Sequence, residues 1–212
     1  MDASPSAALP LVIASGNAGK IREFAGLLAP LPVRVVPQPE GLEVEENGAS
    51  FAANAALKAM AVARATGCWA LADDSGLEVR ALGGAPGVHS ARYAATDPLR
   101  IARLLQELAE ANRQRLAAGQ PEDRSARFTA ALAVADPGGA IRLEVEGHCP
   151  GQILPAPRGS GGFGYDPVFW VPEAGLSFAE MDKPSKARIS HRGCAFALLE
   201  PRLRQLLAAE IG

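Results

Sequence analysis

The sequence predicts an α/β fold built on a mixed β-sheet. An apolar run of strand length, Leu9 to Ala14, is followed by a small-residue loop at Ser15 to Gly19. Apolar residues then recur at helical spacing until Pro30, after which Val33 to Val36 is predicted as a second strand. Further along, Asp136 to Gly139 is typical of a hairpin turn and predicts antiparallel strands in the same sheet.

The central part of the chain predicts a second helix and two short strands. The segment Pro37 to Gly48 is irregular and acidic, and the Ala-rich stretch Ser50 to Thr66 follows it as a helix that ends at a glycine. Strands are predicted at Trp69 to Ala72 and at Leu77 to Val79. The acidic residues between them, Asp73 to Gly76, are interpreted as a break between the strands.

The second half predicts one long helix followed by a hairpin. Asp97-Pro98 is typical of an N-cap and a first-turn proline. The polar end of this helix, around Gly119 to Asp123, is expected to be exposed. Strands are predicted at Phe128 to Ala135 and at Ile141 to Val145, on either side of the hairpin turn.

The chain ends in a last predicted helix. Ser190 would cap it, and Pro201 predicts a kink or a break inside it. No linker composition interrupts the sequence after a short leader that we expect to be disordered. We therefore treat residues 1–212 as a single domain of two lobes.

Composition excludes several classes of protein. With 48% hydrophobic residues, the chain has enough apolar side chains for a core, and 21 basic against 23 acidic residues argue against wrapping nucleic acid or covering a membrane surface. Three cysteines without a CxxC pair argue against a disulfide framework and a zinc site. The first ten residues do not resemble a signal peptide, and no apolar run is long enough to span a bilayer. We expect a cytoplasmic protein.

A glycine-containing loop between the first strand and helix is the first candidate site. Backbone amides at a helix N-terminus suit a phosphate, and a lysine would add a positive charge. The loop is not a Walker A motif, because two residues separate its glycines and Ile21 follows the lysine. An ordinary turn with a solvated lysine remains an alternative. The candidate residues are Ser15, Gly16, Asn17, Ala18, Gly19 and Lys20.

Paired acidic residues form the second candidate, at Glu45-Glu46 and at Asp73-Asp74. Mg²⁺ typically takes one or two carboxylates together with phosphate oxygens and water, so acids on two loops that face one cleft would suit it. Since neighbouring residues of a strand point to opposite faces, only one acid of each pair is expected to bind the metal directly. A solvated loop and a turn are the structural alternatives.

Two further segments carry residues suited to a nucleotide. In Gly159 to Pro167, Phe163 is suited to stack on a base and Asp166 to bind its edge, although both aromatic residues of this loop could instead lie in the core. Lys183 to Arg192 holds four cations and a histidine just before the last predicted helix, which favours an anion site. A solvated basic loop and a surface patch for RNA remain alternatives.

Taken together, these segments resemble the inosine triphosphate pyrophosphatase family, across nearly the whole chain. The motifs that carry the resemblance are ASGNAGKIREF, EENGASFAANAALKA, LADDSGLEVRALGGAPGVHSARY, GSGGFGYDPVF and KPSKARISHRG. The resemblance implies an elongated mixed β-sheet flanked by helices, with two lobes and a central active-site cleft. It also implies a homodimer that hydrolyses ITP, dITP and XTP, and thereby removes deaminated purines from the nucleotide pool.

The resemblance also implies roles for particular residues. The loop Ser15 to Lys20 would hold phosphate, Glu46 and Asp74 would bind Mg²⁺, and Asp74 would also orient the attacking water, assisted by Lys58. The remaining implied substrate contacts are Ser75, a base pocket of Phe163, Gly164, Tyr165 and Asp166 with His191 and Arg192, and Lys186 at the phosphates.

Two competing interpretations stay open. A Maf-like pyrophosphatase would keep the phosphate chemistry but act on pyrimidine or modified nucleotides, which the Phe163 to Asp166 loop disfavours. A non-catalytic nucleotide or RNA binding module would not need Glu46 and Asp74, so its binding should survive chelation of Mg²⁺.

Overall fold

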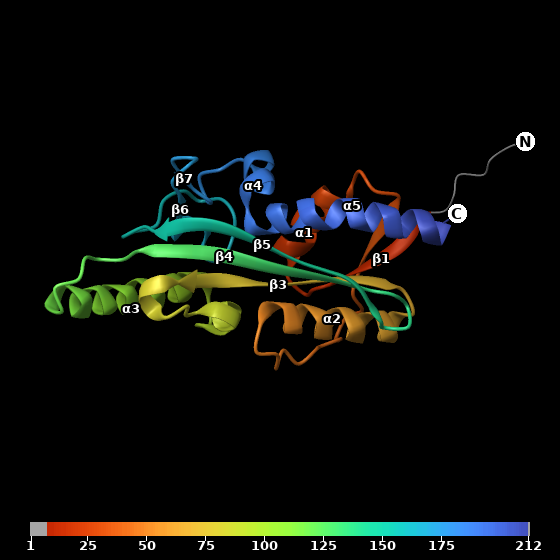
Figure 1. The fold of residues 1–212 in the computed structure, drawn as a ribbon, viewed down its shortest axis with the longest axis horizontal. Coiled ribbons are helices and arrows are strands. Elements are labelled where there is room, and N and C mark those ends of the chain that lie inside the picture. The colour runs from red at the N-terminus through yellow and green to blue at the C-terminus, as the bar shows by residue number, and fades with distance from the viewer. Residues whose placement is uncertain (1–7, 212) are drawn as a thin grey trace, which may run out of the picture. The chain divides into compact units, whose positions relative to one another are not determined.

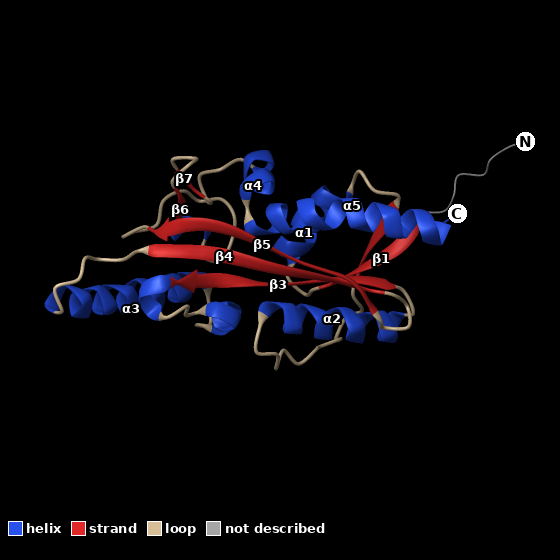
Figure 2. Cartoon of the chain, in the orientation of Figure 1, coloured by secondary structure: helices blue, strands red, loops and turns tan. Residues whose placement is uncertain are grey.

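The computed structural model describes residues 8–211, and the predicted leader over residues 1–7 lies outside them. A seven-stranded sheet with strand order β2-β1-β3-β4-β5-β6-β7 forms the fold, with helices packed beside it (Figures 1 and 2). The strands are β1 (Leu9–Ala14), β2 (Val33–Pro37), β3 (Trp69–Val79), β4 (Ser125–Ala135), β5 (Ile141–Ile153), β6 (Phe169–Val171) and β7 (Leu176–Ser177). The α-helices are α1 (Ala18–Leu28), α2 (Phe51–Thr66), α3 (Asp97–Ala117), α4 (Lys183–Ile189) and α5 (His191–Ile211).

The predicted mixed sheet is confirmed. Strand β1 pairs in parallel with both β2 and β3, whereas β5 with β6 and β6 with β7 are antiparallel. Asp136 makes the turn between β4 and β5, since its Oδ1 accepts from the amides of Gly138 and Ala140, each at 3.0 Å. Gly139, with φ of 82°, supplies the left-handed residue that this hairpin requires.

The chain divides into two compact units. The first unit contains residues 8–74, 131–147 and 193–211, and the second contains residues 75–130 and 148–192. In the first unit, α1 and α5 lie on one face of the parallel strands and α2 lies on the other face (Figure 1). Strand β1 lies in the core of this unit, and its residues Leu11 to Ala14 are at most 2% exposed.

Helix α2 forms where the sequence predicts it. Ser50 caps its first turn by accepting from the amide of Ala53 at 3.1 Å, and Gly67 ends it in the left-handed conformation, with φ of 63°. Three of its buried residues, Ala55, Ala59 and Ala63, are alanines, which lets the helix approach the sheet closely. The helix carries Asn54 and Lys58.

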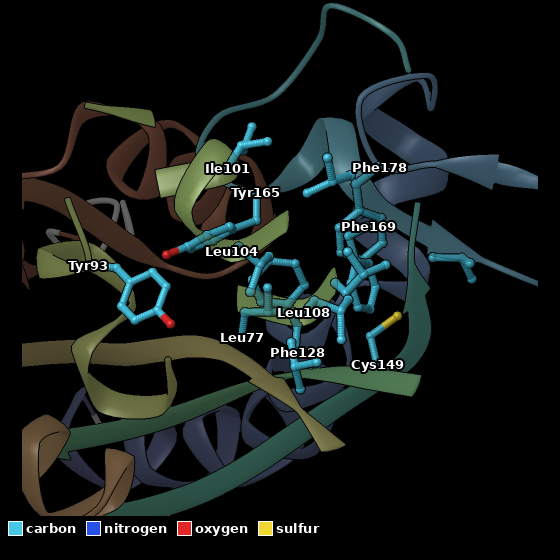
Figure 3. Packing of buried hydrophobic residues seen from close by; sticks show 14 residues of the cluster. Leu77, Tyr93, Ile101, Leu104, Leu108, Phe128, Cys149, Tyr165, Phe169 and Phe178 are labelled. Atoms are coloured by element: carbon cyan, nitrogen blue, oxygen red, sulfur yellow. The ribbon is translucent and has the colours of Figure 1, made fainter. Parts of the chain in front are cut away.

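The second unit has its own aromatic core, shown in Figure 3. Phe169 lies edge-on to Phe128, with ring centroids 4.7 Å apart, and Phe178 packs beside both. Leu104 and Leu108 of α3 are fully buried in the same cluster, together with Leu77 of β3. Burial of these apolar side chains holds α3 to the strands of this unit.

Several sequence predictions need correction. Strand β3 is continuous from Trp69 to Val79, so Asp73 to Gly76 do not break it. Helix α3 is capped by Thr96, whose hydroxyl accepts from the Leu99 amide, and Asp97 is its first residue and not its N-cap. Ser190 is the C-cap of α4 and, as predicted, directly precedes the last helix, whereas α5 continues through Pro201 without a break.

The polar segment after α3, residues 119–123, was predicted to be exposed, but its last residue is buried. Asp123 is only 5% exposed, and Arg80 Nε binds its carboxylate at 2.5 Å. Asn112, 3% exposed, accepts from the Asp123 amide at 2.8 Å and so holds the same turn from the helix. Between residues 8 and 211, no helix is both long and apolar enough to cross a membrane.

Candidate functional site

Acidic and basic side chains converge in the first unit. Lys58 of α2 donates from Nζ to Glu46 Oε1 at 2.7 Å and to Asp74 Oδ1 at 3.1 Å. Lys20 of α1 lies 2.5 Å from Asp73 Oδ2. We call these five residues the carboxylate–lysine cluster.

The two acids of β3 point to opposite faces of the strand and meet lysines from different helices. Asp73 has a side chain only 1% exposed, and an unpaired carboxylate would be costly there. The strand continues through both acids because each is paired with a cation. Sequence reasoning placed a break here since neither lysine is near Asp73 or Asp74 in the chain.

Lys58 is held in its charged form. Burial acts to lower the pKa of Lys58, but the nearby carboxylates of Asp74 and Glu46 outweigh burial and raise the pKa above its ordinary value of 10.5. The side chain therefore carries a full positive charge at neutral pH. An ammonium shared by two carboxylates also shows that Glu46 and Asp74 converge on one point.

A side chain of the loop before α1 caps the N-terminus of that helix. Asn17 caps α1, and its Oδ1 accepts from the amides of Gly19 at 2.8 Å and Lys20 at 3.2 Å. The Asn17 amide in turn donates to Ser15 Oγ at 3.1 Å. These amides, which the sequence suggested for phosphate, are bonded within the loop here. Lys20 is the residue of this segment that reaches a carboxylate, that of Asp73.

A second group of predicted residues converges in the second unit around an aromatic ring. Arg192 Nη2 donates to Ser75 Oγ at 2.6 Å, and the Arg192 guanidinium carbon lies 5.6 Å from the centre of the Phe163 ring. Lys186 Nζ lies 5.0 Å from the same ring. Two cations thus approach one aromatic side chain, and we call Ser75, Phe163, Lys186 and Arg192 the aromatic cluster.

Asp166 holds the loop of Phe163 in place. Its Oδ2 accepts from the Phe163 amide at 2.8 Å and from Lys186 Nζ at 2.6 Å, and the residue is 4% exposed. A Cβ at Gly162, where φ is +73°, would lie 2.0 Å from this oxygen. The glycine is therefore required for close approach within the loop, and Gly164 is tied down through its amide, which donates to Asp97 Oδ2 at 2.8 Å.

Tyr165 and His191 lie in the core of the second unit. The Tyr165 hydroxyl donates to the Ser90 carbonyl at 2.9 Å, and burial raises the pKa of this phenol. The His191 ring stacks on Phe128 with centroids 4.6 Å apart and ring planes 12° from parallel. Both side chains support the loop and α4 from within, which matches the core alternative left open for Tyr165.

The basic segment Lys183 to Arg192 is not a loop. It forms α4 and the start of α5, and Asp182 caps α4 by accepting from the Ser185 amide at 2.8 Å. Lys186 and Arg192 are consequently buried, at 9% and 4% exposed, while Lys183 is exposed. The run of charges in the sequence does not by itself show which cations are buried and which are exposed.

Two residues that contact the predicted site residues were not identified from the sequence. Asn54 of α2 donates from Nδ2 to Asp74 Oδ2 at 3.0 Å, and its sequence signal is its position four residues before Lys58 on the same helix face. Phe128 stacks on His191, a contact that nothing in the local sequence indicates. Among residues 8–211 no group of three or more His, Cys, Asp or Glu side chains is arranged to hold a metal, and Glu46 and Asp74 are a pair.

The fold and the two clusters define a mixed α/β protein with charged groups suited to phosphate and an aromatic ring suited to a planar base. Comparison with known families identifies it further. Residues 11–202 match the model of the Ham1 family, and the chain belongs to this family.

Relatives and solved structures agree with this assignment. The chain is 60% identical to a dITP/XTP pyrophosphatase of Parasynechococcus marenigrum, over 94% of this chain and 97% of that protein. It is 54% identical to a dITP/XTP pyrophosphatase of Nostoc, over 94% and 96% of the two chains. A HAM1 protein structure from Coxiella burnetii superimposes with a TM-score of 0.82 at 42% identity, covering 93% of this chain and 99% of that one.

Proposed function

We propose that this protein hydrolyses non-canonical purine nucleoside triphosphates, among them ITP, dITP and XTP, to the monophosphate and pyrophosphate. The observation that carries the proposal is the convergence of Glu46 and Asp74 on one cation, Lys58 Nζ, beside a second lysine–aspartate pair. The names of relatives 50–60% identical to the chain, all dITP/XTP pyrophosphatases, support the same activity. Removal of such nucleotides would keep deaminated purines out of the nucleotide pool.

The carboxylates fit the Mg²⁺ ion that this reaction would use. Mg²⁺ characteristically takes one or two protein carboxylates and completes its shell with phosphate oxygens and water. Glu46 and Asp74 supply that number, and their shared contact with Lys58 shows that they reach a common point. When bound, Mg²⁺ would act as a Lewis acid on the phosphate oxygens.

The chain's own side chains would neutralise the negative charge that develops on the phosphates during the reaction. Attack of water at the α-phosphorus increases negative charge on the phosphate oxygens and on the departing pyrophosphate. Lys20 and Lys58 bring two positive charges to this cluster, and the raised pKa of Lys58 keeps its charge in place. Asp74, with its carboxylate fixed at both oxygens, would orient the water.

The aromatic cluster would hold the base. Phe163 offers a face for stacking, and Arg192 is a donor beside it. Hypoxanthine and xanthine carry a 6-oxo group that accepts a hydrogen bond, whereas the 6-amino group of adenine would face Arg192 with a second donor. Rejection of guanine, which also has a 6-oxo group, would have to involve its 2-amino group.

Two further properties belong to the same proposal. Family membership supports a homodimer, which sedimentation velocity would detect as a species of twice the chain mass. Among the described residues, Cys68, Cys149 and Cys194 form no disulfide, which suits a protein of the reducing cytoplasm.

Product analysis tests the function directly. The protein is incubated with ITP, XTP, dITP, ATP, GTP and dTTP, with Mg²⁺ and with excess chelator, and monophosphate and pyrophosphate are measured. We expect rapid pyrophosphate release from ITP, XTP and dITP, slow release from ATP and GTP, and none with chelator. Preference for dTTP would instead indicate the Maf-like activity, and binding without turnover would indicate a non-catalytic module.

A further inference from the structure

Asn54 is a fully buried polar residue in the middle of the carboxylate–lysine cluster. It lies in the first turns of α2 and is 0% exposed. Buried amides are retained where both ends are hydrogen-bonded, because an unpaired end loses its contact with water. The partners of Asn54 therefore show what this residue does.

The two ends of the Asn54 amide bind different parts of the site. Nδ2 donates to Asp74 Oδ2 at 3.0 Å, and Oδ1 accepts from the Gly48 amide at 2.8 Å. The carboxylate can only accept and the amide N–H can only donate, so rotation of the side-chain amide by 180° would place like groups together at both ends. The orientation of Asn54 is thus fixed by its neighbours.

Asp74 is held at both oxygens by one helix. Oδ1 receives Lys58 Nζ at 3.1 Å and Oδ2 receives Asn54, and these two residues lie four positions apart on α2. Residues at this spacing share a helix face, so α2 presents one charged and one neutral donor to the same carboxylate. The rotamer of Asp74 is therefore set by α2.

Gly48 shows that the same helix also locates the acidic segment. A Cβ built on Gly48 would lie 2.7 Å from Asn54 Oδ1, 2.8 Å from Ala53 Cβ and 3.0 Å from the Asn54 backbone nitrogen. Gly48 is not among the glycines with positive φ, so space alone requires a glycine here. Because Gly48 is two residues after Glu46, this close contact limits where Glu46 can lie.

We propose that Asn54 is a positioning residue, which fixes the Asp74 carboxylate and ties the segment of Glu46 to it, so that the two acids stay aligned. This inference rests on the proposed function. Asn54 acts on the reaction through Asp74 and Glu46 and contacts no reacting atom itself. Residues that orient metal-binding carboxylates in this way commonly change activity by about 10- to 100-fold when they are replaced.

Two substitutions separate the two hydrogen bonds. Asn54→Asp keeps an oxygen for the Gly48 amide but places a carboxylate oxygen against Asp74 Oδ2. Gly48→Ala leaves the Asn54 side chain intact but pushes the segment of Glu46 away from α2. We expect each variant to lower kcat for ITP by about 10- to 100-fold, with a change in KM of less than about threefold.

Asn112→Asp is the matched control, because Asn112 is also a buried helical asparagine, 3% exposed, whose amide bonds to the backbone of a following turn. We expect it to lose thermal stability as Asn54→Asp does, while its kcat stays within about twofold of the wild type. Loss of kcat in Asn54→Asp and not in Asn112→Asp would then be due to alignment and not to general destabilisation.

Hydrogen exchange without metal or substrate provides a readout that does not depend on activity. The Gly48 amide should be protected in the wild type and in Asn54→Asp, and should exchange at least about tenfold faster in Asn54→Ala, which removes its acceptor. An unprotected Gly48 amide in the wild type, or wild-type kcat in both Asn54→Asp and Gly48→Ala, would overturn the proposal.

If Asn54→Asp does not fold, the kcat of Gly48→Ala and the exchange rate of the Gly48 amide test the proposal in its place. A wild-type protein without activity on ITP would refute the proposed function, yet the exchange measurement would still test the contact.

Discussion

At the residue scale, Lys58 allows Glu46 and Asp74 to converge. Two carboxylates directed at one point repel each other, and the ammonium between them removes that repulsion. Its folded-state pKa is raised, so the stability that it contributes is complete below pH 10.5 and is lost only as the pH rises through the higher folded-state value. Near neutral pH, titration of Lys58 should therefore change neither stability nor activity.

Replacement of Lys58 by methionine gives a prediction for both metal dependence and activity. Lys58→Met should lower the free energy of unfolding in chelator by about 1–3 kcal/mol, because Glu46 and Asp74 are left partly buried without their cation. Mg²⁺ should restore more stability to this variant than to the wild type, since it supplies the missing charge. Its kcat for ITP should fall by about 100- to 1,000-fold.

Urea unfolding with and without Mg²⁺, together with steady-state kinetics, measures these effects. Lys183→Met is the control, since Lys183 is an exposed lysine at the start of α4. It should differ little from the wild type in both measurements. Equal stabilisation of the wild type and Lys58→Met by Mg²⁺ would contradict the idea that the metal and the lysine neutralise the same pair of carboxylates.

At the scale of elements, helix caps and apolar periodicity were enough to predict those helices and strands whose ends are marked by their own sequence. Helix α2 was predicted correctly because Ser50 and Gly67 mark its ends within the sequence itself. Strands β6 and β7 were not predicted because they contain three and two residues, too few to show a period. Strand β3 was divided wrongly because its acids are paired with lysines of α1 and α2, which are 53 and 16 residues away.

The same reasoning explains which parts of the site could be predicted. The resemblance names all of the residues that converge here: Lys58, Glu46 and Asp74 meet in one place, and Phe163, Ser75 and Arg192 meet in another. Their roles in the reaction stay predictions. Asn54 was missed because its partners lie 6 and 20 residues away, and its spacing of four residues before Lys58 does not by itself indicate what the amide binds.

The turn that follows α3 gives a prediction about acid stability. A hydrogen bond from Arg80, helped by the Ser125 amide and opposed by burial, lowers the pKa of Asp123 from 3.8 to about 2. A carboxylate with a lowered folded-state pKa stabilises the fold above the unfolded-state value, and this contribution is lost as the pH falls through the folded-state value. The stabilisation should be complete above pH 3.8 and should decline toward pH 2.

Asp123→Asn tests this expectation. We expect it to lower the free energy of unfolding by about 1 kcal/mol above pH 4, a modest value because the Arg80 side chain is 73% exposed. The difference from the wild type should shrink when unfolding is measured between pH 4 and pH 3. Glu122→Gln, at an exposed neighbouring acid, should show a smaller difference throughout. A constant difference for Asp123→Asn down to pH 3 would assign its effect to packing and not to charge.

At the scale of the whole molecule, the chain path passes between the two units four times. Strands β3, β4 and β5 and the start of helix α5 each have residues in both units, because the unit boundaries fall after Asp74, Ala130, Gly147 and Arg192. The carboxylate–lysine cluster belongs to the first unit, the aromatic cluster belongs to the second, and Asp74 and Ser75 are consecutive residues. Loss of pairing within one of these strands should therefore affect both clusters, and we expect the units to unfold in one transition.

A thermal-shift measurement with a blocked substrate tests whether both clusters serve one ligand. α,β-Methylene-ITP keeps the base and the triphosphate charge but cannot be cleaved between the α- and β-phosphorus. At a concentration 100 times its Kd it should stabilise the fold by about 2.7 kcal/mol. For a chain of this length this free energy corresponds to a rise in Tm of about 5–11 °C. The shift should need Mg²⁺ because, in the proposed function, the phosphates would reach Glu46 and Asp74 through it. Phe163→Ala should weaken the shift at a fixed ligand concentration. A shift that is equal in chelator, or unchanged in Phe163→Ala, would mean that one of the two clusters does not bind this ligand.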